Sequence, residues 1–162
     1  CGDDGGTEPT GAYMTDLTDP DTAEWVYRSI CHVIERYQLD YFRLDSGLFT
    51  GDAQHTIHGI RESVDWRYYD TMYAILKKLT DTNVGLEINT GGYHYGLGEP
   101  NPCTDIIRRY KELGGEIITI GADAHTPDKI GYAFDRAAQV LKECGFEYYT
   151  VFKDRKPNFV KL

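Results

Sequence analysis

The chain has 162 residues, of which 41% are hydrophobic, and a formal net charge of -9 from 26 acidic and 17 basic residues. That length and composition predict one globular domain over residues 1–162. The negative charge argues against a nucleic-acid partner and against an anionic membrane, because the summed field repels phosphate groups. A small phosphate substrate would need a metal ion or a local basic pocket.

The cysteines and the N-terminus bear on the cellular location of the protein. Cys1, Cys31, Cys103 and Cys144 are far apart and form no Cys-x-x-Cys pair, so we expect reduced thiols and a cytoplasmic location. No apolar run approaches the roughly 18 residues of a membrane span. The chain begins at Cys1 in a Gly/Asp/Thr-rich stretch without an initiator methionine, which is typical of a piece of a longer protein.

Hydrophobic periodicity and turn residues predict helices that alternate with short β-rich runs. The predicted helices are residues 20–37, 65–79, 102–113 and 127–144, and the predicted strands are residues 39–44, 84–88, 116–121, 148–152 and 158–161. The segments 46–64 and 89–102 carry glycines without a clear period and are predicted to be loops of the kind that build active sites.

Strand and helix alternation predicts βαβ units with parallel strands. The expected fold class is therefore α/β, most simply a partial (βα) barrel, or half-barrel, with four to five parallel strands. Such a barrel keeps its reactive groups at the C-terminal ends of its strands. Because a half-barrel leaves two sheet edges unpaired, we expect a homo-oligomer, a dimer or larger.

One strand end carries a candidate metal pair. Asp123 and His125 follow the strand at 116–121, and strand alternation predicts that their side chains point together. Carboxylate oxygen and imidazole nitrogen are both ligands for Zn²⁺, Fe or Mn²⁺. The alternative is that Asp123 caps the next helix while His125 hydrogen-bonds a loop carbonyl.

From Leu86 to Leu162 the chain resembles the C-terminal part of the PHP-type histidinol phosphatases, through LEINTGGYHYGLGEPNP and RRYKELGGEIITIGADAHTPDKIGYAFDRAAQVLKECGFEYYTVFKDRKPNFVKL. The resemblance implies a distorted seven-stranded (βα) barrel, a cluster of two or three metals, and hydrolysis of histidinol phosphate. It also implies that Asp123 and His125 are metal ligands. The family takes most of its other ligands from a His-x-His motif and from mid-chain residues, and this sequence contains no His-x-His.

The same resemblance implies that Glu87, Asn89 and His94 line the substrate side of the site. Glu87 and Asn89 alternate with Leu86 and Ile88, so the polar pair is predicted to point into the barrel. For Glu87 and Asn89 the alternative is a buried hydrogen-bonded pair without catalytic duty. For His94 it is simple exposure to solvent.

The N-terminal half resembles a different family. The stretches YMTDLTDPDTAEWVYRSICHVIERYQLDYFRLD and DWRYYDTMYAILKKL resemble the barrel of α-galactosidase-like retaining glycosidases, which implies that Asp45 is a catalytic nucleophile. Arg43-Leu44 replaces the Lys-Trp of that family, and Asp45 has no identifiable partner carboxyl group, although this mechanism needs two. A seam between two families is placed near residues 82–86, which suggests a chimera.

Three functions follow from these observations. The first is a metal-dependent phosphomonoester hydrolase of the histidinol-phosphatase type, incomplete in this chain. The second is a fragment of a retaining glycosidase that uses Asp45. The third is an inactive (βα) scaffold, and we expect it to describe the measured activity.

Overall fold

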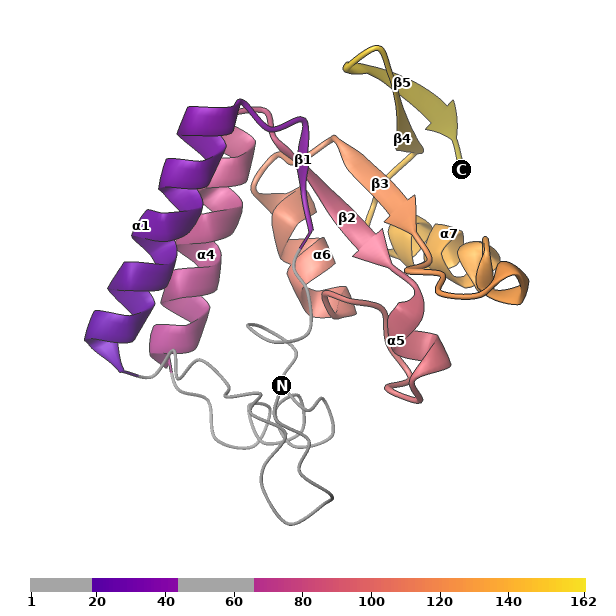
Figure 1. The fold of residues 1–162 in the computed structure, drawn as a ribbon, viewed down its shortest axis with the longest axis horizontal. Helices are drawn as coiled ribbons and strands as arrows, with labels where there is room; N and C mark the ends of the chain where they lie inside the picture. Colours follow the sequence, from indigo (N-terminus) through magenta and orange to yellow (C-terminus); the bar gives the residue numbers. More distant parts are fainter. Residues whose placement is uncertain (1–18, 44–65) are drawn as a thin grey trace.

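The computed structural model describes residues 19–43 and 66–162 (Figure 1). In chain order its elements are α1 (Pro20–Tyr37), β1 (Tyr41–Phe42), α4 (Trp66–Asp81), β2 (Gly85–Asn89), α5 (Gly91–His94), α6 (Thr104–Glu112), β3 (Ile118–Gly121), the 3-10 helix η1 (Pro127–Lys129), α7 (Phe134–Glu143), β4 (Tyr148–Lys153) and β5 (Lys156–Lys161). The predicted alternation of strands and helices is therefore confirmed for the described residues.

The hydrogen bonds at the two ends of α1 explain why its bounds could be predicted from the sequence. The Asp19 side chain accepts a 2.8 Å hydrogen bond from the backbone N–H of Thr22, and Pro20 occupies the first turn. The helix ends at Gln38, which adopts a left-handed conformation and donates its N–H to the carbonyl of Ile34. Both predicted ends are observed within one residue.

Three strands form a parallel sheet in the order β1-β2-β3. This confirms the α/β class, and a closed barrel is not confirmed. The prediction of four to five parallel strands is wrong for β4 and β5, which pair antiparallel as a separate hairpin. The two residues that join them, Asp154 and Arg155, have φ values of 51° and 59°. Such a two-residue turn makes a hairpin, whereas parallel pairing needs a crossover of a dozen or more residues.

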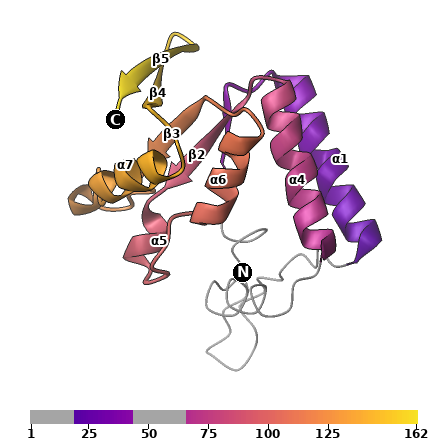
Figure 2. The ribbon, with the colours of Figure 1, turned by 180° about the vertical axis from the view of Figure 1, so that it is seen from behind.

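Helices cover one face of the three-stranded sheet. Seen from behind, α4, α6 and α7 lie in front of the strands, and α1 packs against the outer side of α4 (Figure 2). The strands contribute Leu86, Ile88 and Ile118 to this layer, all with no exposed surface. The core continues through the helices with Val26, Ile30, Ile34, Met72, Ile75, Leu76, Leu79, Ile107, Tyr110, Ala137 and Leu141.

Two predicted segments differ from the structure. The predicted loop at 89–102 begins with the short helix α5. The predicted helix at 127–144 is divided into η1 and α7, because Gly131 and Ala133 both take positive φ values and interrupt the helical path. A continuous helix over 127–144 would turn Ile130 and Phe134 toward the core with Ala137 and Leu141, but both are exposed, with 76% of the Ile130 surface open to solvent.

The predictions on the cysteines and on membrane spans can be compared with the structure. Among the described residues, Cys31, Cys103 and Cys144 are free thiols, as expected. In the ranges 19–43 and 66–162 no helix is both long and apolar enough to cross a membrane. The single domain, the seam at 82–86 and the oligomeric state stay predictions.

Candidate functional site

The face of the sheet opposite the helices carries polar side chains. Register pairs Glu87 with Thr119 and Asn89 with Gly121, so these four residues share one face, and Leu86 and Ile88 share the other. Glu87 and Asn89 are buried, and the Asn89 amide nitrogen donates a 3.4 Å hydrogen bond to Glu87 Oε1. The predicted orientation of this polar pair is therefore observed. Its role in binding substrate stays a prediction.

Gly121 makes room for the Glu87 carboxyl group. A Cβ atom at position 121 would lie 2.7 Å from the carboxyl carbon of Glu87. The carboxylate therefore lies across the end of β3, close to the segment that carries Asp123.

Arg43, directly after β1, lies near one acid in β2 and another just after β3. Its Nη2 atom lies 2.9 Å from Asp123 Oδ2, and its Nε atom lies 3.8 Å from Glu87 Oε1. About a third of the Arg43 side chain is exposed, at 32%, so the Asp123 pair is stronger than one in open solvent. A single guanidinium thus faces two carboxylates, one in β2 and one just beyond the end of β3.

Asp123 and His125 lie side by side, with 3.7 Å between His125 Nε2 and Asp123 Oδ1. The geometric prediction is correct, but its stated reason is not. Strand β3 ends at Gly121, and Asp123 has a φ of 50°, so a left-handed turn rather than strand alternation brings the two side chains together. Their role as metal ligands stays a prediction.

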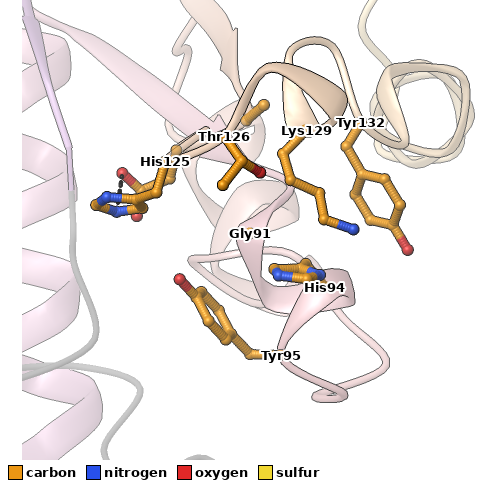
Figure 3. Close-up of a pocket in the computed structure, with 9 residues that line it drawn as sticks. Gly91, His94, Tyr95, His125, Thr126, Lys129 and Tyr132 are labelled. Carbon is orange, nitrogen blue, oxygen red and sulfur yellow. Dashed lines mark ion pairs between the residues drawn. The ribbon is translucent and has the colours of Figure 1, made fainter.

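A pocket opens beside this pair. It is lined by Gly91, His94, Tyr95, Ala122, Asp123, His125, Thr126, Lys129 and Tyr132. His94, Lys129 and Tyr132 gather on one side of it, and His125 lies on the other (Figure 3). The His94 ring lies edge-on to Tyr132 with 5.9 Å between ring centroids, and Lys129 Nζ lies 5.0 Å from the centre of the Tyr132 ring. The structure therefore brings His94 into the same pocket as Asp123 and His125.

Hydrogen bonds at the end of β2 position the His94 side of the pocket. Asn89 Oδ1 accepts a 2.8 Å hydrogen bond from the N–H of Gly91, which starts α5. The backbones of Asn89 and Asn101 exchange two hydrogen bonds of 2.7 and 2.9 Å, which fold the following segment back on β2. Gly92 lies against that segment, because a Cβ there would be 2.2 Å from the carbonyl oxygen of Glu99.

Sequence reasoning missed Lys129 and Tyr132 as pocket residues. Both fall in the helix predicted over 127–144, and a position in a continuous helix did not indicate that either residue lines a pocket. The signal that could have found them is Gly131, since a glycine inside a helical pattern marks a position where the chain can turn. The turn there brings Lys129 and Tyr132 beside His94.

The donor atoms fit a divalent cation in type but are few in number. Asp123 offers oxygen and His125 nitrogen, as Zn²⁺, Fe and Mn²⁺ require. Within the described ranges, however, no group of three or more His, Cys, Asp or Glu side chains is placed to hold a metal ion. Asp45, the candidate glycosidase nucleophile, lies outside the described residues.

Comparison with known proteins gives several relatives over about half of the chain. A protein named "Probable histidinol-phosphatase" from Thermotoga maritima is 40% identical over 82 residues, which are 51% of this chain and 35% of that protein. A protein of the same name from Clostridium acetobutylicum is 34% identical over 83 residues, 49% of this chain and 31% of that protein. No family model matches. The chain thus spans about a third of the length of these curated relatives.

One solved structure resembles a larger share of the chain. It is the crystal structure of histidinol phosphate phosphatase from Lactococcus lactis, complexed with Zn, L-histidinol and phosphate. The TM-score is 0.56 and the identity 19%, over 91% of this chain and 56% of that protein. At that identity the likeness shows the fold alone. None of these matches supports the glycosidase resemblance or the chimera.

Proposed function

We propose that this chain carries part of the active site of a metal-dependent phosphomonoester hydrolase of the histidinol-phosphatase kind. The observation that carries the proposal is the position of Asp123 and His125, which are 3.7 Å apart at the end of a parallel strand and line one pocket with His94 and Lys129. The similarity of half the chain to histidinol-phosphatases supports it.

Each residue of the pocket has a proposed role. Asp123 and His125 would hold a divalent ion such as Zn²⁺, Fe or Mn²⁺, and such an ion supplies hydroxide near neutral pH and neutralises phosphoryl oxygens. Lys129 provides positive charge for an anionic ester in a chain whose net charge is -9. His94 faces the substrate from the same side as Lys129, across the pocket from His125 (Figure 3), and Glu87 and Asn89 support the floor of the site. The substrate would be a small phosphate ester, histidinol phosphate by similarity.

The test is phosphate release from L-histidinol phosphate in the presence of Zn²⁺ or Mn²⁺. This proposal replaces the inactive scaffold that was expected from the sequence: the unmodified chain should hydrolyse the ester, and Asp123→Asn and His125→Gln should each lower the rate at least about 100-fold. Asp105→Asn is the matched control, because Asp105 is an exposed acid on α6, with 63% of its side chain open, and it does not line the pocket. It should retain full activity.

Two results would contradict the proposal. One is an unmodified, folded chain that releases no phosphate with either ion, which would support the inactive scaffold instead. The other is hydrolysis that survives both substitutions. Covalent labelling of Asp45 by a fluoro-sugar would favour the glycosidase alternative.

A further inference from the structure

The charges around Arg43 set up a competition. Glu87 is a carboxylate with only 9% of its surface exposed, and a buried carboxylate needs a cation or several hydrogen bonds nearby. Its neighbours include the Asn89 amide at 3.4 Å and Arg43 Nε at 3.8 Å. Asp123 has Arg43 Nη2 at 2.9 Å from one oxygen and His125 Nε2 at 3.7 Å from the other. The guanidinium is the cation that these two acids share.

A metal ion held by Asp123 and His125 would have to approach the same carboxylate. The guanidinium occupies Oδ2 of Asp123, and its positive charge lies within a few ångströms of any cation that binds there. Repulsion between a divalent ion and a guanidinium at such a distance weakens binding of the ion. The guanidinium also neutralises part of the negative charge of Asp123 and Glu87, which would otherwise attract the ion.

We propose that Arg43 holds the place of a cation between Glu87 and Asp123, so that the guanidinium and a divalent ion exclude each other at this carboxylate. Arg43 is thus a positioning residue that opposes metal binding at Asp123 and His125. The inference rests on the proposed function only in taking these two residues as the donors. Ion binding is measured without substrate, so a failure to hydrolyse esters leaves the inference standing.

The experiment is a titration of the full chain with Co²⁺, whose visible absorption reports its ligands, and with Zn²⁺ in competition with a chromophoric chelator. Arg43→Met keeps the apolar stem and removes the charge, and we expect it to bind both ions at least about tenfold more tightly than the unmodified chain. Arg43→Lys keeps the charge and should bind as the unmodified chain does. Arg28→Met, which removes an arginine that is 77% exposed on α1, is the matched control and should also bind unchanged.

Double variants locate the ion. Arg43→Met combined with Asp123→Asn should lose the gain in affinity. An affinity that is equal in Arg43→Met and in the unmodified chain, with circular dichroism showing both folded, would overturn the inference. So would a gain that survives Asp123→Asn.

A second measurement covers the case in which Arg43→Met does not fold. In the unmodified chain, NMR signals of the Arg43 Nε–H group and of the His125 ring are followed as Zn²⁺ is added. If the ion displaces the guanidinium, both signals change together along the titration. A His125 signal that changes while Arg43 stays constant would overturn the inference, and so would a constant His125 signal in a chain that binds Zn²⁺ elsewhere.

Discussion

The hydroxyl of Thr90 donates a 2.6 Å hydrogen bond to the backbone carbonyl of Tyr132. Thr90 directly follows β2 and has no exposed surface, whereas Tyr132 belongs to the turn between η1 and α7. This bond therefore joins the segment that carries His94 to the segment that carries Lys129, and it holds these two residues on the same side of the pocket (Figure 3).

Thr90→Val should loosen this connection. Valine has the same shape but no hydroxyl, so the Tyr132 carbonyl loses its partner and the free energy of unfolding should fall by about 1–2 kcal/mol. Amide hydrogen exchange in residues 129–134 should become faster at the same time. Thr90→Ser keeps the hydroxyl and should keep the protection of that segment. Equal protection in the valine and serine variants would show that the bond does not hold the turn.

Tyr110 joins helix α6 to two strands. Its hydroxyl lies 3.1 Å from the carbonyl oxygen of Ile117 and 3.3 Å from that of Val84, and the side chain is 1% exposed. Tyr110→Phe removes this bond while the ring continues to fill the core, so a loss of about 1 kcal/mol is expected in urea unfolding. Tyr110→Leu should cost more, because the ring itself is lost. A phenylalanine variant as stable as the unmodified chain would contradict this.

The same tyrosine makes stability depend on alkaline pH. Burial raises the pKa of Tyr110 above its ordinary value. The folded chain therefore keeps the phenolic proton at a pH where the unfolded chain releases it, and the contribution to stability is complete below about pH 10 and is lost as pH rises beyond it. Unfolding midpoints between pH 8 and 11 should fall less steeply for Tyr110→Phe than for the unmodified chain. If the unfolding midpoints of Tyr110→Phe and of the unmodified chain fall equally steeply with pH, Tyr110 is not the source of the pH dependence.

Two glycines should respond differently to the same substitution. At Gly92 a methyl group would meet the backbone oxygen of Glu99 at 2.2 Å, and a backbone atom cannot move aside easily. At Gly121 it would meet the end of the Glu87 side chain at 2.7 Å, which can rotate away. We therefore expect Gly92→Ala to cost about 3 kcal/mol and Gly121→Ala about 1 kcal/mol in denaturant unfolding. The reverse order would show that the Glu87 carboxylate is the more rigid of the two neighbours.

Arg155 fastens the C-terminal hairpin to the start of β1. Its guanidinium donates to both Asp40 carboxylate oxygens, at 3.0 and 3.3 Å, and to the carbonyl of Gln38 at 2.6 Å. Arg155→Gln should speed amide exchange in β4 and β5 while the α1 amides stay unchanged. Because 65% of the Arg155 side chain is exposed, added salt should reproduce part of the effect in the unmodified chain. Exchange that is insensitive to both changes would show that strand packing alone holds the hairpin.

Local signals in the sequence predicted most of the elements. The Asp19 cap and Pro20 fixed the start of α1, and apolar runs located β2 and β3, because these features act within a few residues. The last two strands were counted among the parallel strands although only a short charged turn, with no helix, separates them in the sequence. The two turn residues, Asp154 and Arg155, are left-handed although neither is glycine or asparagine, so the sequence did not indicate a two-residue hairpin turn.

The candidate site was predicted in part for a similar reason. Asp123 and His125 stand two residues apart, so sequence alone could group them. Arg43 reaches Asp123 only because β1 and β3 lie on either side of β2. The contact of Lys129 with the Tyr132 ring depends on a chain reversal near Gly131. The spacing of residues in the sequence cannot predict these contacts, because tertiary packing creates them.

The central position of β2 also governs when this site can exist during synthesis. As the ribosome releases the chain, Arg43 emerges first, Glu87 next and Asp123 last, and β1 has no described neighbour in the sheet until β2 appears. A nascent chain that stops before β3 would therefore hold an acid and a base without the strand that brings the second carboxylate. The third strand completes the sheet and brings the second carboxylate to Arg43 in the same event, so a folding assay that reports one should report the other.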